Sequence, residues 1–389
     1  MASQRTPLVL GFSLAIGSVV VCLLLAELAL QIIGKPSPDI SGWRFKGRTS
    51  ETNELGFRGQ PIQYESDDFV VVMLGDSQVA AYACAFEWMP ERRLQHYLTN
   101  NGNTGNKNVK VFTIGTEGYG QDQQLLLMQE FYRTYRADLV VLWQTPNNDV
   151  WNNMFPTHWP ANGWPKPTFT LTNNELSGPS EGMGDPVKRN NLKLLALLDR
   201  VVPIFDRDGD WEKQLPQPYA PFTNYQGPVC NDWQQRYDGD VGYMRNENLQ
   251  TEKSHLAMSL VPASKRMQYG LDLTRTLLRE IDQTVTKNGG RFVVFNVDAP
   301  ENQAYVRPEC KGDDEIVRRL NGNYYKTSRT QYRENVKYIN RGLASFTIPV
   351  TVSGWRRGPD DAHLNQHAVD QVMQDLAGKL PHKPRSLAP

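Results

Sequence analysis

The 389-residue sequence lacks an excess of charge of either sign, because 42 lysine and arginine residues balance 42 aspartate and glutamate residues. Nucleic-acid-binding proteins carry a basic footprint, so this balance disfavours nucleic acid as a partner. The sequence also lacks a His-Glu-x-x-His motif, a paired Cys-x-x-Cys motif and a P-loop lysine after its glycine-rich stretch 115–120. We therefore expect no metal and no other cofactor.

Cysteine is scarce, with four residues in the chain. Cys22 lies in an apolar N-terminal segment, and Cys84 lies in a segment with a helical pattern, typical of a small buried side chain. Cys230 and Cys310 lie in polar loops that contain proline, a context that suits a disulfide. The sequence leaves this pairing open, because three free thiols outside the apolar segment fit the count equally well.

One long apolar run stands near the N-terminus, where Leu8 to Ala26 gives 19 residues without a charge. At a rise of 1.5 Å per residue this run spans about 28 Å, close to the thickness of the hydrocarbon core. We therefore expect residues 1–34 to be a transmembrane anchor. A cleaved signal peptide is the rival interpretation, but the run exceeds the usual 7 to 15 residues of a signal core.

Apolar and amphipathic segments alternate through the rest of the chain, which predicts an α/β fold with a parallel sheet and helices on both faces. The predicted strands are 69–74, 109–114, 138–144, 291–297 and 347–352, and the predicted helices are 78–99, 121–136, 263–287 and 365–379. Residues 35–66 are expected to form a polar tether and residues 67–384 the main domain. The pattern fails at 151–262, which predicts an inserted lid or subdomain.

The strand at 69–74 stops at Gly75-Asp76-Ser77, so Ser77 is expected at the carboxyl edge of the sheet, where open α/β folds place their sites. Asp76 is interpreted as a turn-stabilising side chain. Three further stretches follow in order: Gly118 in 114–120, Asn148 in Pro-Asn-Asn-Asp, and Asp360-Asp361-Ala362-His363. Together these four blocks resemble the SGNH (GDSL-like) hydrolase superfamily, which implies a three-layer α/β/α fold with a flavodoxin-like sheet.

A serine hydroxyl needs a base within hydrogen-bond reach, and that base needs a third group to orient it. His363 is the candidate base for Ser77, because it has an aspartate three positions earlier. Asp360 is the candidate third group, with Asp361 as the alternative. The competing interpretation is that the two aspartates only cap the following helix.

The resemblance also implies an oxyanion hole made by the Ser77 N–H, the Gly118 N–H and the Asn148 side-chain amide. Glycine suits position 118, because a side chain would obstruct the approach of substrate to the backbone. Two departures from the family pattern stand beside these residues. Gln78 follows the serine where many relatives carry an apolar residue, and Pro146 replaces the glycine of the third block, which alters backbone freedom next to Asn148.

Several tryptophans cluster around Asn148, and Trp151 and Trp159 are candidate substrate-binding residues that could stack on a sugar ring, although buried packing is the commoner fate of tryptophan. The sequence thus predicts a membrane-anchored serine esterase with an extracytoplasmic catalytic domain, in the periplasm or at the cell surface. The expected substrate is an O-acyl ester, with O-acetyl groups of a cell-surface polysaccharide as the specific class. The alternatives are an O-acyltransferase that uses the same residues and a noncatalytic scaffold of a polysaccharide-export complex.

Overall fold

A central sheet of five parallel strands organises the fold, in the order β12-β9-β5-β3-β4. The computed structural model describes residues 6–33, 40–41, 44–45, 51–100, 108–157, 166–179, 207–233, 248–299, 307–358 and 361–380. The five strands are β3 (Phe69–Gly75), β4 (Val109–Gly115), β5 (Leu139–Gln144), β9 (Arg291–Asp298) and β12 (Ser345–Pro349). Numbered along the chain their order is 2-1-3-4-5, the flavodoxin-like arrangement.

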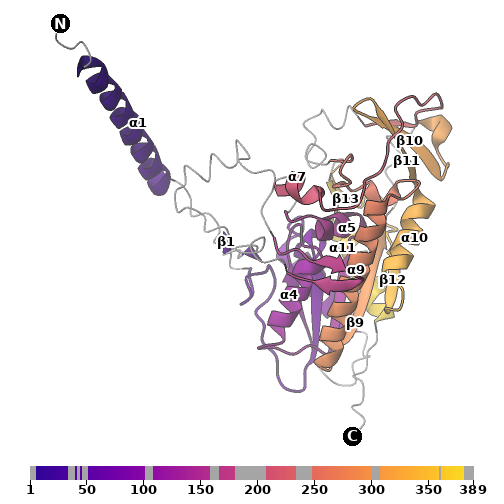
Figure 1. Cartoon of the computed structure of the whole chain (residues 1–389). Coiled ribbons are helices and arrows are strands. Elements are labelled where there is room, and N and C mark those ends of the chain that lie inside the picture. Colours follow the sequence, from indigo (N-terminus) through magenta and orange to yellow (C-terminus); the bar gives the residue numbers. More distant parts are fainter. Residues whose placement is uncertain are drawn as a thin grey trace.

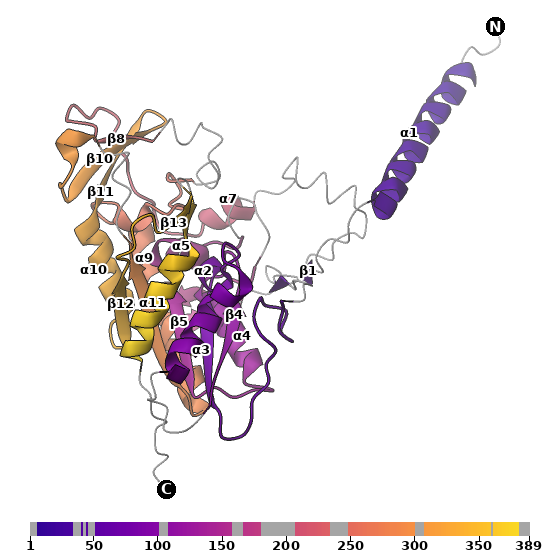
Figure 2. The same cartoon turned by 180° about the vertical axis from the view of Figure 1, so that it is seen from behind.

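Helices cover both faces of this sheet, as Figures 1 and 2 show from opposite sides. Val71 and Met73 of β3 pack with α3 and α11, whereas Val70 and Val72 pack with α4 and α9. The main helices are α2 (Ser77–Ala80), α3 (Pro90–Asn100), α4 (Gln121–Phe131), α5 (Pro146–Met154), α9 (Lys265–Lys287), α10 (Arg329–Ile339) and α11 (Gln366–Lys379). The predicted α/β class with a parallel sheet is therefore confirmed.

Three strands end level with one another, which brings the predicted motifs to one edge. Gly75 at the end of β3 pairs with Gly115 of β4 and with Trp143 of β5. A Cβ atom at Gly115 would lie 2.1 Å from the Gly75 carbonyl oxygen, so only glycine permits this close approach. The loops and helices that follow these strands therefore begin at the same carboxyl edge of the sheet, and they carry Ser77, Gly118 and Asn148.

Residues 51–62, assigned to a tether from the sequence, pack against the edge strand β4. The Asn53 side chain donates to the Thr113 carbonyl at 2.8 Å, and the Gln60 side chain donates to the Val111 carbonyl at 2.5 Å. Glu91 of α3 accepts from the Thr113 N–H at 2.7 Å. These side chains satisfy backbone groups that an edge strand would otherwise leave unpaired.

A second, smaller sheet joins distant parts of the chain in the order β11-β10-β8. Its strands are β8 (Asn231–Asp232), β10 (Glu315–Leu320) and β11 (Asn323–Ser328). Cys230 and Cys310 form a disulfide with a Cα–Cα distance of 5.7 Å, which settles the pairing that the sequence left open. The subdomain that contains this sheet therefore combines β8, which lies in the predicted insertion, with the β10–β11 hairpin, which lies after it.

Short elements complete the described chain. These are β1 (Ile40–Ser41), β2 (Arg44–Phe45), η1 (Phe86–Trp88), β6 (Thr170–Thr172), β7 (Glu175–Ser177), α7 (Arg207–Glu212), η3 (Ala257–Ser259), η5 (Pro308–Cys310), β13 (Arg356–Gly358) and β14 (Asp361–Leu364). The predicted insertion at 151–262 therefore contains short strands and helices of its own. They lie before and after the segments of the insertion that fall outside the described residues.

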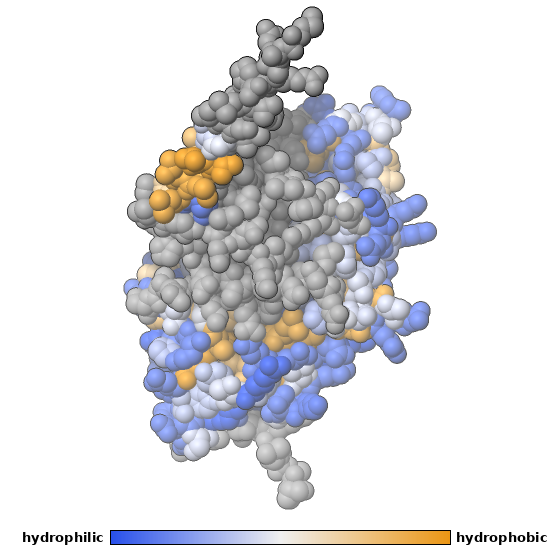
Figure 3. Space-filling view, turned by 60° about the vertical axis from the view of Figure 1, so that its left-hand side comes forward, coloured by the Kyte–Doolittle hydropathy of each residue, from blue (hydrophilic) through white to orange (hydrophobic). Residues whose placement is uncertain are grey.

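The N-terminal segment forms α1 (Thr6–Ile33), and its described side chains include several exposed apolar residues. Figure 3 shows a hydrophobic patch on one face of the molecule. Within the described residues, however, no helix is both long and apolar enough to cross a membrane. This finding contradicts the predicted N-terminal transmembrane anchor, on which the predicted membrane location depended.

Candidate active site

Ser77 stands at a sharp strand-to-helix turn. β3 ends at Gly75, Asp76 is the N-cap of α2, and Ser77 is its first residue. The Asp76 carboxylate accepts a hydrogen bond from the Gln78 N–H at 2.9 Å, which confirms its turn-stabilising role. The helix stops after one turn at Ala81, which has a φ of 44° in the left-handed region. This local geometry leaves the Ser77 side chain half-buried at the edge of the sheet.

His363 reaches Ser77 from the C-terminal part of the chain. It lies on β14, and its Nε2 atom is 2.8 Å from Ser77 Oγ. On the other side of the ring, Nδ1 is 2.5 Å from Asp361 Oδ1. Ser77, His363 and Asp361 therefore form a continuous hydrogen-bonded chain, with the imidazole between the hydroxyl and the carboxylate.

Asp361, the alternative to Asp360 in the sequence, makes the contact with the histidine. The His363 backbone N–H also donates to Asp361 Oδ1, at 3.0 Å, so the two-residue spacing closes a local turn that holds both groups. The predicted Asp360 lies outside the described residues. No feature of the sequence alone separates two adjacent aspartates, because the choice depends on which side chain faces the ring.

Asp361 is suited to remain ionised. Burial raises the pKa of its carboxyl group, but hydrogen bonds from the His363 backbone and ring, together with the charges of His363 and Arg357, outweigh burial and leave the pKa below its usual value. Arg357 lies 3.5 Å from Asp361 Oδ2. An ionised carboxylate at Nδ1 keeps the proton on that nitrogen and leaves Nε2 able to accept the serine proton.

Asn148 is held beside Ser77 by the residue that precedes the serine. Its Nδ2 atom donates to Asp76 Oδ2 at 3.0 Å, and only 9% of Asn148 is exposed. α5 begins at Pro146, in the first turn of a helix, where a missing N–H breaks no helical hydrogen bond. The Asp149 carboxylate accepts from the Thr145 N–H at 2.9 Å and so closes the start of this helix.

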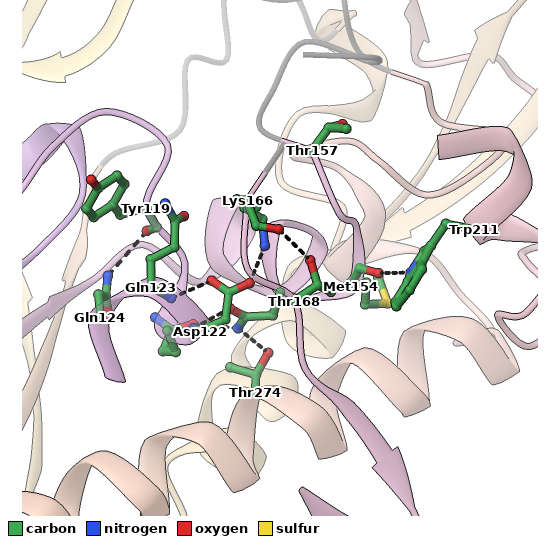
Figure 4. A network of polar contacts seen from close by, with 12 residues as sticks. Tyr119, Asp122, Gln123, Gln124, Met154, Thr157, Lys166, Thr168, Trp211 and Thr274 are labelled. Carbon is green, nitrogen blue, oxygen red and sulfur yellow. Dashed lines mark hydrogen bonds and ion pairs between the residues drawn. The ribbon is translucent and has the colours of Figure 1, made fainter. Parts of the chain in front are cut away.

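Gly118 follows β4 with a φ of 72°, a left-handed conformation that favours glycine. The loop that contains it leads into α4, and a buried polar network fixes the first turn of that helix (Figure 4). Gln124 donates to the Tyr119 carbonyl at 3.2 Å. Asn153 of α5 accepts from the Asp122 N–H at 3.3 Å and donates to Gln121 at 2.6 Å. The network therefore joins the helix behind Gly118 to the helix that carries Asn148.

Two buried ion pairs belong to the same region and carry no signal in the sequence. Lys166 and Asp122 form a fully buried pair, drawn in Figure 4. Burial lowers the pKa of Lys166 and raises that of Asp122, because it disfavours both charged forms. Lys253 is 2.7 Å from Asp208, and burial lowers its pKa to about 8. Such pairs lie far apart in sequence, so no spacing rule could have found them.

Arg58, in the N-terminal segment, binds the end of the short helix that begins with the candidate nucleophile. Its guanidinium group donates to the carbonyl oxygens of Ala80 at 3.3 Å, Ala81 at 2.6 Å and Cys84 at 2.9 Å. Its Nε donates to Glu51 at 2.9 Å. These carbonyls belong to the end of α2 and the turn after it, so Arg58 fixes the short helix that starts at Ser77. The sequence predicted a tether at 35–66 and assigned no role to Arg58.

Trp151 cannot stack on a sugar ring as the sequence suggested, because it is only 1% exposed and packs against His255 and Lys253. Its ring therefore presents no face to a substrate. Trp159 lies outside the described residues. Among the described residues, no group of three or more histidine, cysteine, aspartate or glutamate side chains is placed to hold a metal ion.

Comparisons with known proteins give structural neighbours alone. No family model and no curated protein matches the sequence. The structure is similar to the lipase Lip_vut3 from a goat rumen metagenome, with a TM-score of 0.35 and 9% identity over 80% of this chain and 96% of that chain. It is also similar to a protein assigned as a GDSL-like lipase from Parabacteroides merdae, with a TM-score of 0.31 and 8% identity over 82% of this chain and 98% of that chain. At these TM-scores, conclusions about activity depend on the site itself.

Proposed function

We propose that the protein is a serine esterase of the SGNH (GDSL-like) type, in which Ser77 attacks the carbonyl carbon of an acyl ester. One observation carries the proposal: His363 lies between Ser77 Oγ, at 2.8 Å, and the Asp361 carboxylate, at 2.5 Å. A hydroxyl, an imidazole and a carboxylate in this order are the groups that nucleophilic acyl transfer requires.

In the proposed reaction, His363 Nε2 takes the proton from Ser77 Oγ as the hydroxyl oxygen bonds to the ester carbon. The same nitrogen then gives the proton to the departing alcohol, which leaves an acyl group on Ser77. Water attacks this acyl-serine with His363 again as base. The bond between the acyl carbon and Ser77 Oγ then breaks, and His363 returns the proton to Oγ as the acid product leaves. The Asn148 amide, which Asp76 orients, supplies a donor for the oxyanion together with the Ser77 and Gly118 N–H groups.

The proposed substrate is an O-acyl ester, and the more specific proposal is an O-acetyl group on a cell-surface polysaccharide. The carbohydrate part of this proposal depends on the tryptophans that cluster around Asn148 in the sequence. The burial of Trp151 removes one of the two aromatic residues that favoured a sugar ring. The acyl group and the alcohol are therefore the first properties to measure.

The test uses the full chain and aryl esters of increasing acyl length, followed by acetylated glycans with and without an unacetylated sugar acceptor. We expect release of acetate from the short esters and covalent labelling of Ser77 by a serine-directed phosphonate. Ser77→Ala should abolish both results, whereas Ser353→Ala, which changes an exposed serine, should leave them unchanged. The double variant of Ser77→Ala with His363→Ala should be little slower than either single variant, because members of one catalytic unit are not additive.

Transfer of the acetyl group to the sugar acceptor in place of water would favour the O-acyltransferase. A wild-type protein that resists the phosphonate and releases no acyl group from any ester would contradict the esterase and favour the noncatalytic scaffold.

A further inference from the structure

The short strand pair β13–β14 carries both His363 and Asp361. Its strands pair at Arg356 with Leu364 and at Gly358 with Asp361, and the register shifts between these two pairs. Two strands of this length are at best marginally stable by themselves. The hydrogen bonds that the imidazole makes on both sides therefore need an anchor beyond the strand pair.

Asn365 follows β14 directly and binds the chain where it enters β13. Its backbone N–H donates to the Trp355 carbonyl at 2.8 Å. Its side-chain Nδ2 donates to the Gly354 carbonyl at 2.7 Å and to the Arg356 carbonyl at 3.3 Å. One residue, two positions after His363, thus binds three consecutive carbonyls at one end of the strand pair.

The same side chain starts the helix α11. Asn365 is its N-cap, and Oδ1 accepts from the Ala368 N–H at 3.1 Å. The Asn365 carbonyl accepts from the Val369 N–H at 2.9 Å. Ala368 and Val369 are buried in the core on this face of the sheet, so α11 is a firm support. Asn365 therefore joins the strand pair that carries His363 to that helix.

An amide suits this double role, because it donates from nitrogen and accepts at oxygen. A carboxylate at the same position would still accept from the helix N–H but would offer no donor to the carbonyls. Aspartate and asparagine are about equally good N-caps. Asn365→Asp therefore keeps the cap and removes the side-chain hydrogen bonds to the strand pair, so the two functions can be tested separately.

We propose that Asn365 is a positioning residue for the acid–base chemistry of the candidate active site, and that it holds the His363 imidazole between Ser77 and Asp361 by fixing the strand pair to α11. The hydrogen bonds described above join Asn365 to backbone groups, so it acts on His363 through the backbone. The proposal rests on the proposed esterase for its kinetic test, whereas the placement of the imidazole can be measured without activity.

The kinetic test compares full-chain variants on a short aryl ester. Asn365→Asp should lower kcat about tenfold to 10²-fold with KM changed less than about twofold, because a small misplacement of a catalytic group has a cost of this size. Its thermal transition should stay cooperative, since the cap remains. Gln366→Glu is the matched control, because it adds the same charge at the next position and should keep the wild-type rate. Asn365→Ala, which loses both functions, should lower both kcat and Tm.

A merely structural role would slow the reaction whether or not the base is present. In the His363→Ala background, Asn365→Asp should therefore cost less than about twofold, because residues that act as one unit are not additive. NMR of the full chain with isotope-labelled histidine, at a pH where the imidazole is neutral, gives a second measurement. The Nδ1 proton signal of His363, assigned by its loss in His363→Ala, should shift or broaden in Asn365→Asp and stay unchanged in Gln366→Glu.

The two measurements separate this proposal from the esterase itself. If the wild type hydrolyses no ester but the imidazole signal still changes in Asn365→Asp, the esterase fails and the positioning role stands. Asn365→Asp with the wild-type imidazole signal would overturn the positioning role, and so would an equal loss of rate with and without His363.

Discussion

The Asn148 side chain donates a hydrogen bond to Asp76, the residue immediately before Ser77, with 3.0 Å between Nδ2 and Oδ2. Asp76 accepts the Gln78 N–H with its other oxygen, so one carboxylate orients both the turn of the nucleophile and an oxyanion donor. Burial raises the pKa of Asp76, and the hydrogen bonds from Gln78 and Asn148 oppose this effect. Asp76 is therefore a positioning residue for the proposed reaction.

Asp76→Asn should lower kcat about 10²- to 10³-fold with a smaller change in KM, the loss expected when one oxyanion donor is removed. The new amide leaves one acceptor oxygen for two donors, so Asn148 loses its orientation. Asn148→Ala should give a similar loss, and the double variant should be little slower than either. Glu117→Gln, at an exposed position near Gly118, is the control. Additive losses in the double variant would show that the two residues act separately.

Asp361→Asn should lower kcat about 10³- to 10⁴-fold, because the amide cannot hold His363 in the tautomer that accepts a proton at Nε2. Asp360→Asn, its neighbour in sequence, should change kcat less than about threefold. Steady-state rates on a short aryl ester decide between them. If Asp360→Asn is the more damaging variant, the carboxylate partner of His363 is the one first predicted from the sequence.

Arg58→Lys should destabilise the protein by about 2 to 4 kcal/mol, because lysine cannot serve three separate carbonyl oxygens and leaves buried acceptors unpaired. It should also lower kcat at a temperature where the protein remains folded, since α2 carries Ser77. Glu51→Gln, which keeps all three carbonyl contacts, should be much milder. Chemical denaturation and rate measurements on the same preparations test this expectation. A destabilised variant with unchanged kcat would limit Arg58 to a structural role.

Four of the five strands were predictable because each is a short apolar run bounded by turn residues, whereas the predicted strand 347–352 overlaps β12 only at 347–349. Predicted strand 69–74 matches β3 within one residue, and 109–114 matches β4 equally well. The parallel register then follows from the alternation with helices, and it places the strand ends at one edge. Ser77 and His363 were recognisable because their chemistry requires those residue types, although 286 positions separate them.

Other features depend on contacts that no local pattern contains. The β10–β11 hairpin went unpredicted because its strands are rich in charged and polar residues and are stabilised by β8, more than 80 positions earlier. Predicted helix 78–99 is interrupted between α2 and α3, where Ala81 takes a left-handed conformation. The role of Arg58 was not predicted either, because its carbonyl partners lie 22 to 26 positions later and no local pattern indicates them.

Glu91 ties residues 51–62 to the sheet edge and gives the protein a stability that depends on pH. Its two carboxylate oxygens accept from the Gln60 and Thr113 N–H groups, both at 2.7 Å. Burial nevertheless raises its pKa from 4.5 to about 7, against the effect of these hydrogen bonds and of Arg92. The folded protein therefore keeps a proton between these two pH values that the unfolded chain has released.

The unfolding free energy should fall as pH rises from 5 to 7, by about 1.4 kcal/mol per pH unit at most, because the native state binds one proton more than the unfolded state. The contribution from Glu91 is fully present below pH 4.5 and is lost above pH 7. Denaturant unfolding at pH 5, 6, 7 and 8 measures this slope. Glu91→Gln should reduce the slope, whereas Glu87→Gln, at an exposed position in the same segment, should leave it unchanged. A slope that survives in Glu91→Gln would assign the proton to another group.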